Sequence, residues 1–192
     1  MSRNEADEKL VEMALAGESD AFGEIVGRWE RKIFALCYGM LGREEDARDA
    51  AQETFISAFR HLNNFRGDAK VSSWLHRIAV NQCLTRLRRQ KTRNEAPLES
   101  DADDDSISFL AADGLLPSGE TEQKERIETV RKAVGALPPE LKQIVVMKEF
   151  EEMTFQEISE TLEIPLSTVK SRLYTALKQL KKRLEKTPLQ VV

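Results

Sequence analysis

The chain has 192 residues, of which 32% are charged and 6% aromatic, and its formal net charge is -4. Few strand-favouring clusters of β-branched and aromatic residues occur, so this composition is typical of a helix-rich soluble protein. No apolar run approaches the roughly 20 residues of a membrane helix. The N-terminal stretch SRNEADEKL has no apolar signal-peptide core either. We therefore expect a cytoplasmic protein.

Soft metal ligands are scarce, because the only cysteines and histidines are Cys37, Cys83, His61 and His76. A structural zinc site needs four ligands at recognisable spacings, so we expect two buried free thiols and no metal or other cofactor. Neither histidine has a motif-level nucleophile as its neighbour, and no glycine-rich phosphate loop occurs. An enzyme therefore has little support.

Charge is unevenly distributed along the chain. Residues 66–93 contain 8 basic and 1 acidic residues, whereas residues 94–125 contain 1 basic and 10 acidic residues. The acidic stretch also has two prolines and two glycines and no sustained apolar period, which predicts a flexible linker with a short helical turn at 108–112. The sequence thus predicts an all-α fold of two small helical domains, residues 1–93 and 126–192, joined by this linker over 94–125.

Four helices are expected in the first domain, at residues 5–17, 20–41, 43–65 and 72–90. Gly17 and Gly42 should end the first two, and Ser19 or Asp20 should cap the second. The third should bury one apolar stripe, made of Ala47, Ala50, Ala51, Phe55, Ala58 and Phe59.

Four more helices are expected in the second domain, the first two at residues 121–137 and 140–152, separated by Pro138 and Pro139. Thr154 and Glu157 have the capping-box spacing at the start of the third. Ser167 should cap the last.

The stretch TFQEISETLEIPLSTVKSRLYTALKQL, residues 154–180, predicts a helix-turn-helix, whose second helix enters the major groove of DNA. An apolar stripe of the last helix should pack on Phe155, Ile158, Leu162 and Ile164; it comprises Leu166, Val169, Leu173, Ala176, Leu180 and Leu184. The opposite face carries Ser167, Ser171, Tyr174, Thr175, Lys178, Lys181 and Lys182, flanked by Lys170 and Arg172.

No acid occurs between Pro165 and Arg183. Solvated faces usually mix charge signs, so we favour DNA contact over a plain solvated face.

A second basic face is expected on the helix at 72–90, where Arg77, Asn81, Thr85 and Arg88 align. Just upstream lies a loop that contains a glycine, made of Phe65, Arg66, Gly67, Asp68, Ala69 and Lys70. Arginine and lysine can follow a phosphate backbone, and asparagine can bond a base edge, so this face is a second candidate for nucleic-acid binding. Trp74 beside it is either a core residue or a platform for a stacked base.

The exposed side of the third helix is acidic, with Glu45, Asp46, Asp49, Gln52 and Glu53. It would repel DNA, and it suits either a protein partner or plain solvated surface.

Three segments together resemble the sigma-70 family of bacterial transcription initiation factors, specifically its extracytoplasmic-function (ECF) group. The segments are DAFGEIVGRW, EEDARDAAQETFISAFRHLNNFRGDAKVSSWLHRIAVNQCLTRLRR and LPPELKQIVVMKEFEEMTFQEISETLEIPLSTVKSRLYTALKQLKKRL. Their order and spacing are similar to regions two and four of the family over most of the chain.

The resemblance implies a monomer that binds core RNA polymerase at the beta-prime clamp helices and the beta flap, and that directs it to promoter DNA. Asp46, Asp49, Gln52 and Glu53 would contact the polymerase. The loop from Phe65 to Lys70, with Trp74, Arg77, Asn81 and Arg88, would hold the minus-ten element. The minus-thirty-five reader would comprise Pro165, Ser167, Thr168, Lys170, Ser171, Arg172, Tyr174, Thr175 and Lys178. An anti-sigma factor and a stress or envelope response are implied as well.

Two departures from the family pattern bear on promoter preference. Many relatives have arginines where this chain has Thr175 and Leu177, and an aromatic residue or serine where it has Ala69-Lys70-Val71.

Two alternatives remain, a sigma mimic that sequesters an anti-sigma factor and a stand-alone helix-turn-helix repressor. The mimic need not keep basic faces, and the repressor leaves the acidic third helix without a role.

Overall fold

The computed structural model describes residues 3–65, 67, 69–94 and 120–185, and in these ranges it contains helices and no strand. The linker expected over 94–125, its short helical turn, and the loop residues Arg66 and Asp68 lie wholly or mostly outside the described residues. The elements in chain order are α1 (Arg3–Leu15), α2 (Ser19–Leu41), α3 (Glu44–Arg60), the short 3-10 helix η1 (Leu62–Asn64), α4 (Val71–Asn94), α5 (Glu120–Gly135), α6 (Pro139–Val145), the π-helix η3 (Val146–Phe150), α7 (Phe155–Leu162) and α8 (Leu166–Leu184).

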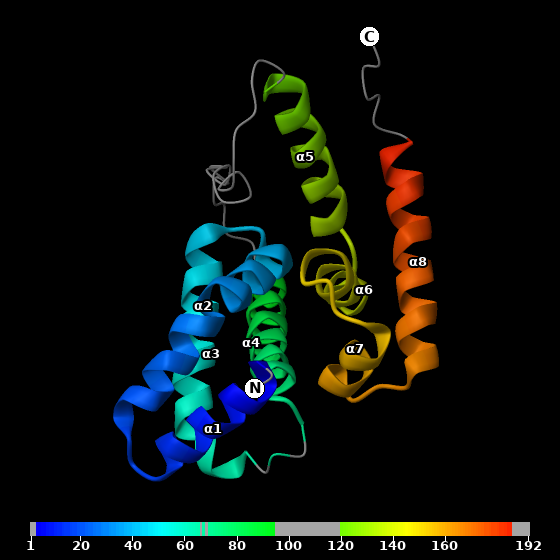
Figure 1. Cartoon of the computed structure of the whole chain (residues 1–192). Helices are drawn as coiled ribbons and strands as arrows, with labels where there is room; N and C mark the ends of the chain where they lie inside the picture. Colours follow the sequence, from blue (N-terminus) through cyan, green and yellow to red (C-terminus); the bar gives the residue numbers. More distant parts are fainter. Residues whose placement is uncertain (1–2, 66, 68, 95–119, 186–192) are drawn as a thin grey trace.

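The four helices predicted in the first half are present and assemble into one bundle (Figure 1), but the third ends at Arg60, and the 3-10 helix η1 takes the place of its expected last turn. In α2, apolar residues three or four positions apart are fully buried, among them Ile33, Leu36 and Met40. Gly42 ends α2 in the left-handed conformation that glycine adopts without steric cost. The expected cap at Ser19 or Asp20 is wrong, because both residues lie inside the helix, and Glu18 occupies the cap position without a side-chain bond.

A buried carboxylate fastens α1 to α2. Asp7 is 1% exposed. It accepts hydrogen bonds from Arg28 Nη1 and from Trp29 Nε1, each at 3.0 Å. A buried charge is tolerated when it is paired and hydrogen-bonded, so these contacts fix where α1 lies.

In the second half, α5 begins at Glu120, inside the stretch expected to be linker, and ends before Pro138 as predicted. The helix expected over 140–152 is instead two elements, because α6 gives way to the π-helix η3 at Val146. Pi-helical turns are rare and are often found at functional positions.

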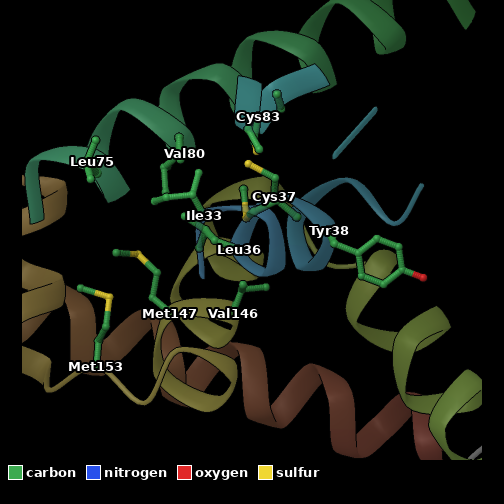
Figure 2. Close-up of a cluster of buried hydrophobic side chains, with 14 of the residues drawn as sticks. Ile33, Leu36, Cys37, Tyr38, Leu75, Val80, Cys83, Val146, Met147 and Met153 are labelled. Carbon is green, nitrogen blue, oxygen red and sulfur yellow. The ribbon is translucent and has the colours of Figure 1, made fainter. Parts of the chain in front are cut away.

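The two halves share a buried core (Figure 2). Ile33 and Leu36 of α2 and Leu75 and Val80 of α4 lie in the same cluster as Val146 and Met147 of η3. Lys142 of α6 is buried as well, and its Nζ lies 3.4 Å from the Met40 carbonyl oxygen. Burial lowers the pKa of this lysine. The second half of the described chain is therefore docked on α2 and α4 of the first half.

Cys37 and Cys83 are both free and buried, as predicted. The hydrogen bond with Cys83, followed by burial, raises the pKa of the Cys37 thiol. None of the helices within the described ranges is both long and apolar enough to cross a membrane.

Candidate nucleic-acid interface

The helix-turn-helix predicted at 154–180 is present as α7 and α8, joined by a turn of three residues. Thr154 and Glu157 form the predicted capping box: the Glu157 backbone N–H donates to Thr154 Oγ1 at 3.2 Å, and the Thr154 backbone N–H donates to Glu157 Oε2 at 3.0 Å. The backbone hydrogen bond from Thr154 is the main reason that the pKa of Glu157 is lowered.

The turn between the two helices is set by backbone geometry. Glu163 adopts the left-handed conformation, with φ of 53°, and ends α7. Ser159 Oγ donates to the carbonyl oxygen of Ile164 at 2.6 Å, which closes the turn. Pro165 occupies the cap position of α8, where a residue without an N–H is no disadvantage. The expected cap at Ser167 is wrong, because Ser167 lies in the first turn of the helix.

The buried side of α8 largely follows the predicted stripe. Val169 and Ala176 are fully buried, and Leu173 and Leu180 nearly so. Leu184 is half-buried, whereas Leu166 is 37% exposed, so its placement in the buried stripe is wrong. Leu166 is the first residue of the helix, at the rim of the packed region.

The opposite side of α8 is exposed and basic, and the nine residues predicted for the minus-thirty-five element lie on this side, at its half-buried flanks (Thr168 and Arg172) or at the helix cap (Pro165). Seven are exposed and two, Thr168 and Arg172, are half-buried; the exposed ones are Pro165, Ser167, Lys170, Ser171, Tyr174, Thr175 and Lys178. Tyr174 is 75% exposed, an unusual position for a tyrosine.

Local contacts organise this α8 face. Ser171 Oγ and Thr175 Oγ1 donate to backbone carbonyl oxygens one turn back, at 3.1 and 2.9 Å. Lys170 Nζ lies 6.0 Å from the centre of the Phe155 ring, at the α7 side of the face.

The second predicted nucleic-acid surface lies on α4 and the residues before it. Among its described members, Gly67, Lys70, Asn81 and Arg88 are exposed. Phe65, Ala69, Trp74 and Arg77 are half-buried. Trp74 packs against Phe65, with ring centroids 5.2 Å apart, and both lie at the edge of the buried core.

Two members of this α4 surface are engaged by the second half of the chain. Lys70 Nζ lies 3.2 Å from Glu157 Oε1, and Arg77 forms an ion pair with Glu163. One residue away, His76 Nε2 lies 3.6 Å from Glu151 Oε2 in a site where both side chains are 5% exposed. Sequence reasoning missed all three pairs, since nothing in the spacing of the acids indicates where the second domain docks.

The acidic surface of α3 is partly tied to α4. Asp46 Oδ2 accepts from Gln90 Nε2 at 3.2 Å, and Asp49 Oδ2 lies 3.7 Å from Arg86 Nη1. Gln52 is exposed and Glu53 half-buried.

Two apolar side chains lie beside this acidic surface. Ile56 follows Gln52 by one turn and is 37% exposed, and Phe59 is 59% exposed. The prediction that Phe59 is buried is therefore wrong: it packs edge-on against Phe22, with ring centroids 5.1 Å apart, at the rim of the bundle. The spacing of Gln52, Ile56 and Phe59 could have shown that an apolar patch continues the acidic face.

The fold and the two basic faces define a helical DNA-binding protein with a helix-turn-helix in its second half. Two family models match it, Sigma-70 region 2 over residues 25–93 and Sigma-70 region 4 over residues 127–180. The chain is also 35% identical to the ECF RNA polymerase sigma factor SigW of Bacillus subtilis, over 92% of this chain and 95% of the relative. It is 33% identical to the RNA polymerase sigma-H factor of Pseudomonas aeruginosa, over 96% and 97% of the two chains.

The chain therefore belongs to the sigma-70 family, as an ECF RNA polymerase sigma factor, which confirms the resemblance seen in the sequence. Solved structures support the fold. CnrH in its complex with the cytosolic domain of CnrY superposes with a TM-score of 0.67 at 22% identity, covering 94% of this chain and 97% of CnrH. The sigma factor RpoE of Bartonella quintana, in complex with the anti-sigma factor NepR, superposes with a TM-score of 0.64 at 17% identity, covering 86% and 97%.

Proposed function

We propose that this sigma factor divides its work among three surfaces of the described chain. The α8 face reads duplex DNA at the minus-thirty-five element, the α4 surface holds the opened minus-ten strand, and the α3 surface contacts core polymerase. The observation that carries the proposal is the α8 face, which is exposed, basic and free of acids from Pro165 to Arg183. Lysine and arginine on one face of a recognition helix bind phosphates, while serine, threonine and tyrosine hydroxyls bond phosphates or base edges.

The α4 surface suits a single strand. Phe65 and Trp74 offer aromatic rings on which a base can stack, and Asn81 offers a side-chain amide for a base edge. Capturing an unpaired base in this way offsets the cost of unstacking it.

The α3 surface suits a protein partner. It combines the carboxylates of Asp46 and Asp49 with the exposed apolar side chains of Ile56 and Phe59. Such a mixture suits an interface with a basic surface on a protein partner. The carboxylates would repel DNA. We assign it to the beta-prime clamp helices of the polymerase, and we assign the second domain to the beta flap.

We further propose that the chain is a monomer without chemistry of its own, that it works in the cytoplasm with the polymerase, and that an anti-sigma factor restrains it. Domain boundaries at residues 93 and 126 and a threaded acidic linker between them belong to the same proposal. Support for an anti-sigma partner comes from the complex of RpoE with the anti-sigma factor NepR.

Two double variants test the assignment of DNA binding to the α8 face and of polymerase binding to the α3 surface. Lys170→Ala with Arg172→Ala should weaken binding to duplex promoter DNA and leave polymerase binding intact. Asp49→Ala with Gln52→Ala should weaken polymerase binding and leave duplex binding intact. Co-elution with core polymerase and duplex mobility shifts measure the two activities. Equal loss of both activities in both variants would refute the assignment of faces.

A further inference from the structure

We propose that the junction between the two halves of the chain is proton-linked. His76 of α4 and Glu151, the residue after η3, hold one proton between them when the halves are packed together, and loss of this proton as the pH rises weakens the packing. This response of the junction to pH goes beyond the proposed function and does not depend on which partner each surface binds.

The contacts of the His76 ring show where its first proton lies. Nδ1 lies 2.6 Å from the backbone carbonyl oxygen of Ser72, one turn earlier in α4. A carbonyl oxygen only accepts hydrogen bonds, so Nδ1 must carry a hydrogen. Because a neutral imidazole has a single N–H, Nε2 of the neutral ring would present a bare lone pair.

The second ring nitrogen faces a carboxylate in a buried site. His76 Nε2 lies 3.6 Å from Glu151 Oε2, both side chains are 5% exposed, and Nε2 has no hydrogen-bond partner in the described part of the chain. Two lone pairs that face each other away from water repel, whereas one added proton makes the contact attractive. The proton can lie on the ring or on the carboxyl group, so it belongs to the pair.

The nearest other carboxylate is already balanced. On the α2 side, His76 packs edge-on against Trp29, with ring centroids 5.9 Å apart. Trp29 Nε1 donates to Asp7 of α1, and Asp7 is paired with Arg28 at 3.0 Å. The charge of Asp7 is thus compensated, and Glu151 is left as the acid that faces His76.

Glu151, in turn, has His76 as its one basic partner among the described residues. It also interacts with the Cys37 thiol of α2, which stays neutral because its hydrogen bond with Cys83 and its burial raise its pKa. The other basic side chains of α4, α6 and η3 near the junction have partners of their own: Lys70 with Glu157, Arg77 with Glu163, Arg86 with Asp49, Lys142 with the Met40 carbonyl oxygen and Lys148 with the Met153 carbonyl oxygen.

His61 provides an internal comparison, because it makes the same local contact without the acid. Its Nδ1 lies 2.8 Å from the Ser57 carbonyl oxygen, also one turn earlier, and the residue is exposed. No carboxylate pairs with its ring within the described ranges. Changes at position 151 should therefore alter the His76 ring and leave the His61 ring as it was.

The direction of the pH dependence follows from the number of bound protons. In the unfolded chain, histidine loses its second proton near about pH 6.5 and glutamate is ionised above about pH 4.3. The unfolded pair therefore holds no proton above neutral pH, whereas the packed pair holds one. The stability that this proton contributes is complete below the unfolded histidine value and is lost as the pH rises further. Lys142 titrates in the same junction, but it is common to all the proteins compared.

The test compares the wild type with Glu151→Gln and Glu152→Gln in the full chain. Glutamine at position 151 keeps the shape of the side chain and can donate to a bare Nε2, so the variant needs no shared proton. Glu152 is the exposed next residue, and its replacement removes the same charge. Imidazole-nitrogen and carboxyl-carbon NMR shifts read the protonation of each ring and of Glu151, urea unfolding reads stability, and amide hydrogen exchange in α7 reads the junction.

Slightly above neutral pH, we expect the wild type to show a proton on His76 Nε2 or on the Glu151 carboxyl group. Glu151→Gln should show a neutral His76 ring with its hydrogen on Nδ1. Between about pH 6.5 and 8.5 the urea midpoint of the wild type should fall relative to that of Glu151→Gln, as expected for about one bound proton, and exchange in α7 should become faster than in the variant at the same pH. Glu152→Gln should follow the wild type throughout.

An ionised Glu151 beside an unprotonated Nε2 in the wild type would overturn the proposal. Parallel pH profiles of the wild type and Glu151→Gln, or equal exchange in α7 at every pH, would overturn it as well. The NMR measurement needs only the wild-type chain, so it decides the question even where Glu151→Gln fails to fold.

Discussion

Gly39 offers the most direct probe of how the two domains are held together. It lies in α2, where a Cβ atom would come within 2.8 Å of Val146 Cγ1 and 3.1 Å of Val146 Cγ2. Val146 is fully buried and β-branched, so its side chain has little freedom to turn away. Inserting a methyl group into such a contact costs about 1 to 3 kcal/mol.

Gly27→Ala is the matched control, because Gly27 lies in the same helix with nothing within 4 Å of its Cβ position. Replacing a helical glycine with alanine should stabilise the control by about 0.5 to 1 kcal/mol. Gly39→Ala shares much of this gain, but its methyl group also meets Val146. Urea unfolding should therefore show Gly39→Ala to be less stable than Gly27→Ala by about 1 to 3 kcal/mol. Its radius of gyration should be larger if the domains separate.

Val146→Ala removes both γ-methyl groups and should recover part of the loss when combined with Gly39→Ala, as expected for coupled neighbours. Equal stability and equal dimensions of Gly39→Ala and Gly27→Ala would refute the close approach of α2 and η3.

Three further predictions concern the stability of the two halves. Asp7→Ala removes the acceptor of Arg28 and Trp29 and should cost about 2 to 3 kcal/mol in urea unfolding; an unchanged midpoint would show that α1 is held otherwise. Thr154→Ala should cost about 1 kcal/mol through the lost cap. Because the folded-state pKa of Glu157 is lowered, its contribution is complete above the ordinary glutamate pKa of about 4.3 and is lost as the pH falls through the folded-state value, so Thr154→Ala should lose less stability on acidification than the wild type, and parallel pH profiles would contradict this. Cys37 and Cys83, both buried, should react with a thiol reagent only after unfolding, and prompt labelling of the folded chain would contradict their burial.

Sequence patterns predicted most helices because their signals are local. The three and four residue spacing in α2, the capping box at Thr154 and the breaks at Gly42 and Pro138 each depend on neighbouring residues alone. The errors arose where several local solutions compete. Ser167 has the chemistry of a cap, yet Pro165 precedes it and starts the helix two residues earlier.

Features that depend on how helices and domains dock could not be predicted from the sequence. Phe59 has the right spacing for the core but lies at the rim, and only the position of α2 decides this. The contacts of Glu157 with Lys70 and of Glu163 with Arg77 join residues more than eighty positions apart. The α8 face could be predicted because its charge and period belong to one helix, whereas these ion pairs depend on how the two domains dock.

We propose that this chain directs core polymerase to promoters through its α8 face and its α4 and α3 surfaces. Co-elution of the purified chain with sigma-free bacterial core polymerase, followed by sequencing of the transcripts that the mixture starts in vitro, tests this function. We expect a stable complex and start sites that share upstream sequence elements, and we expect this shared sequence to be lost when Lys170 and Arg172 are both replaced by alanine. Absence of a complex, or start sites indistinguishable from those of core polymerase alone, would contradict it.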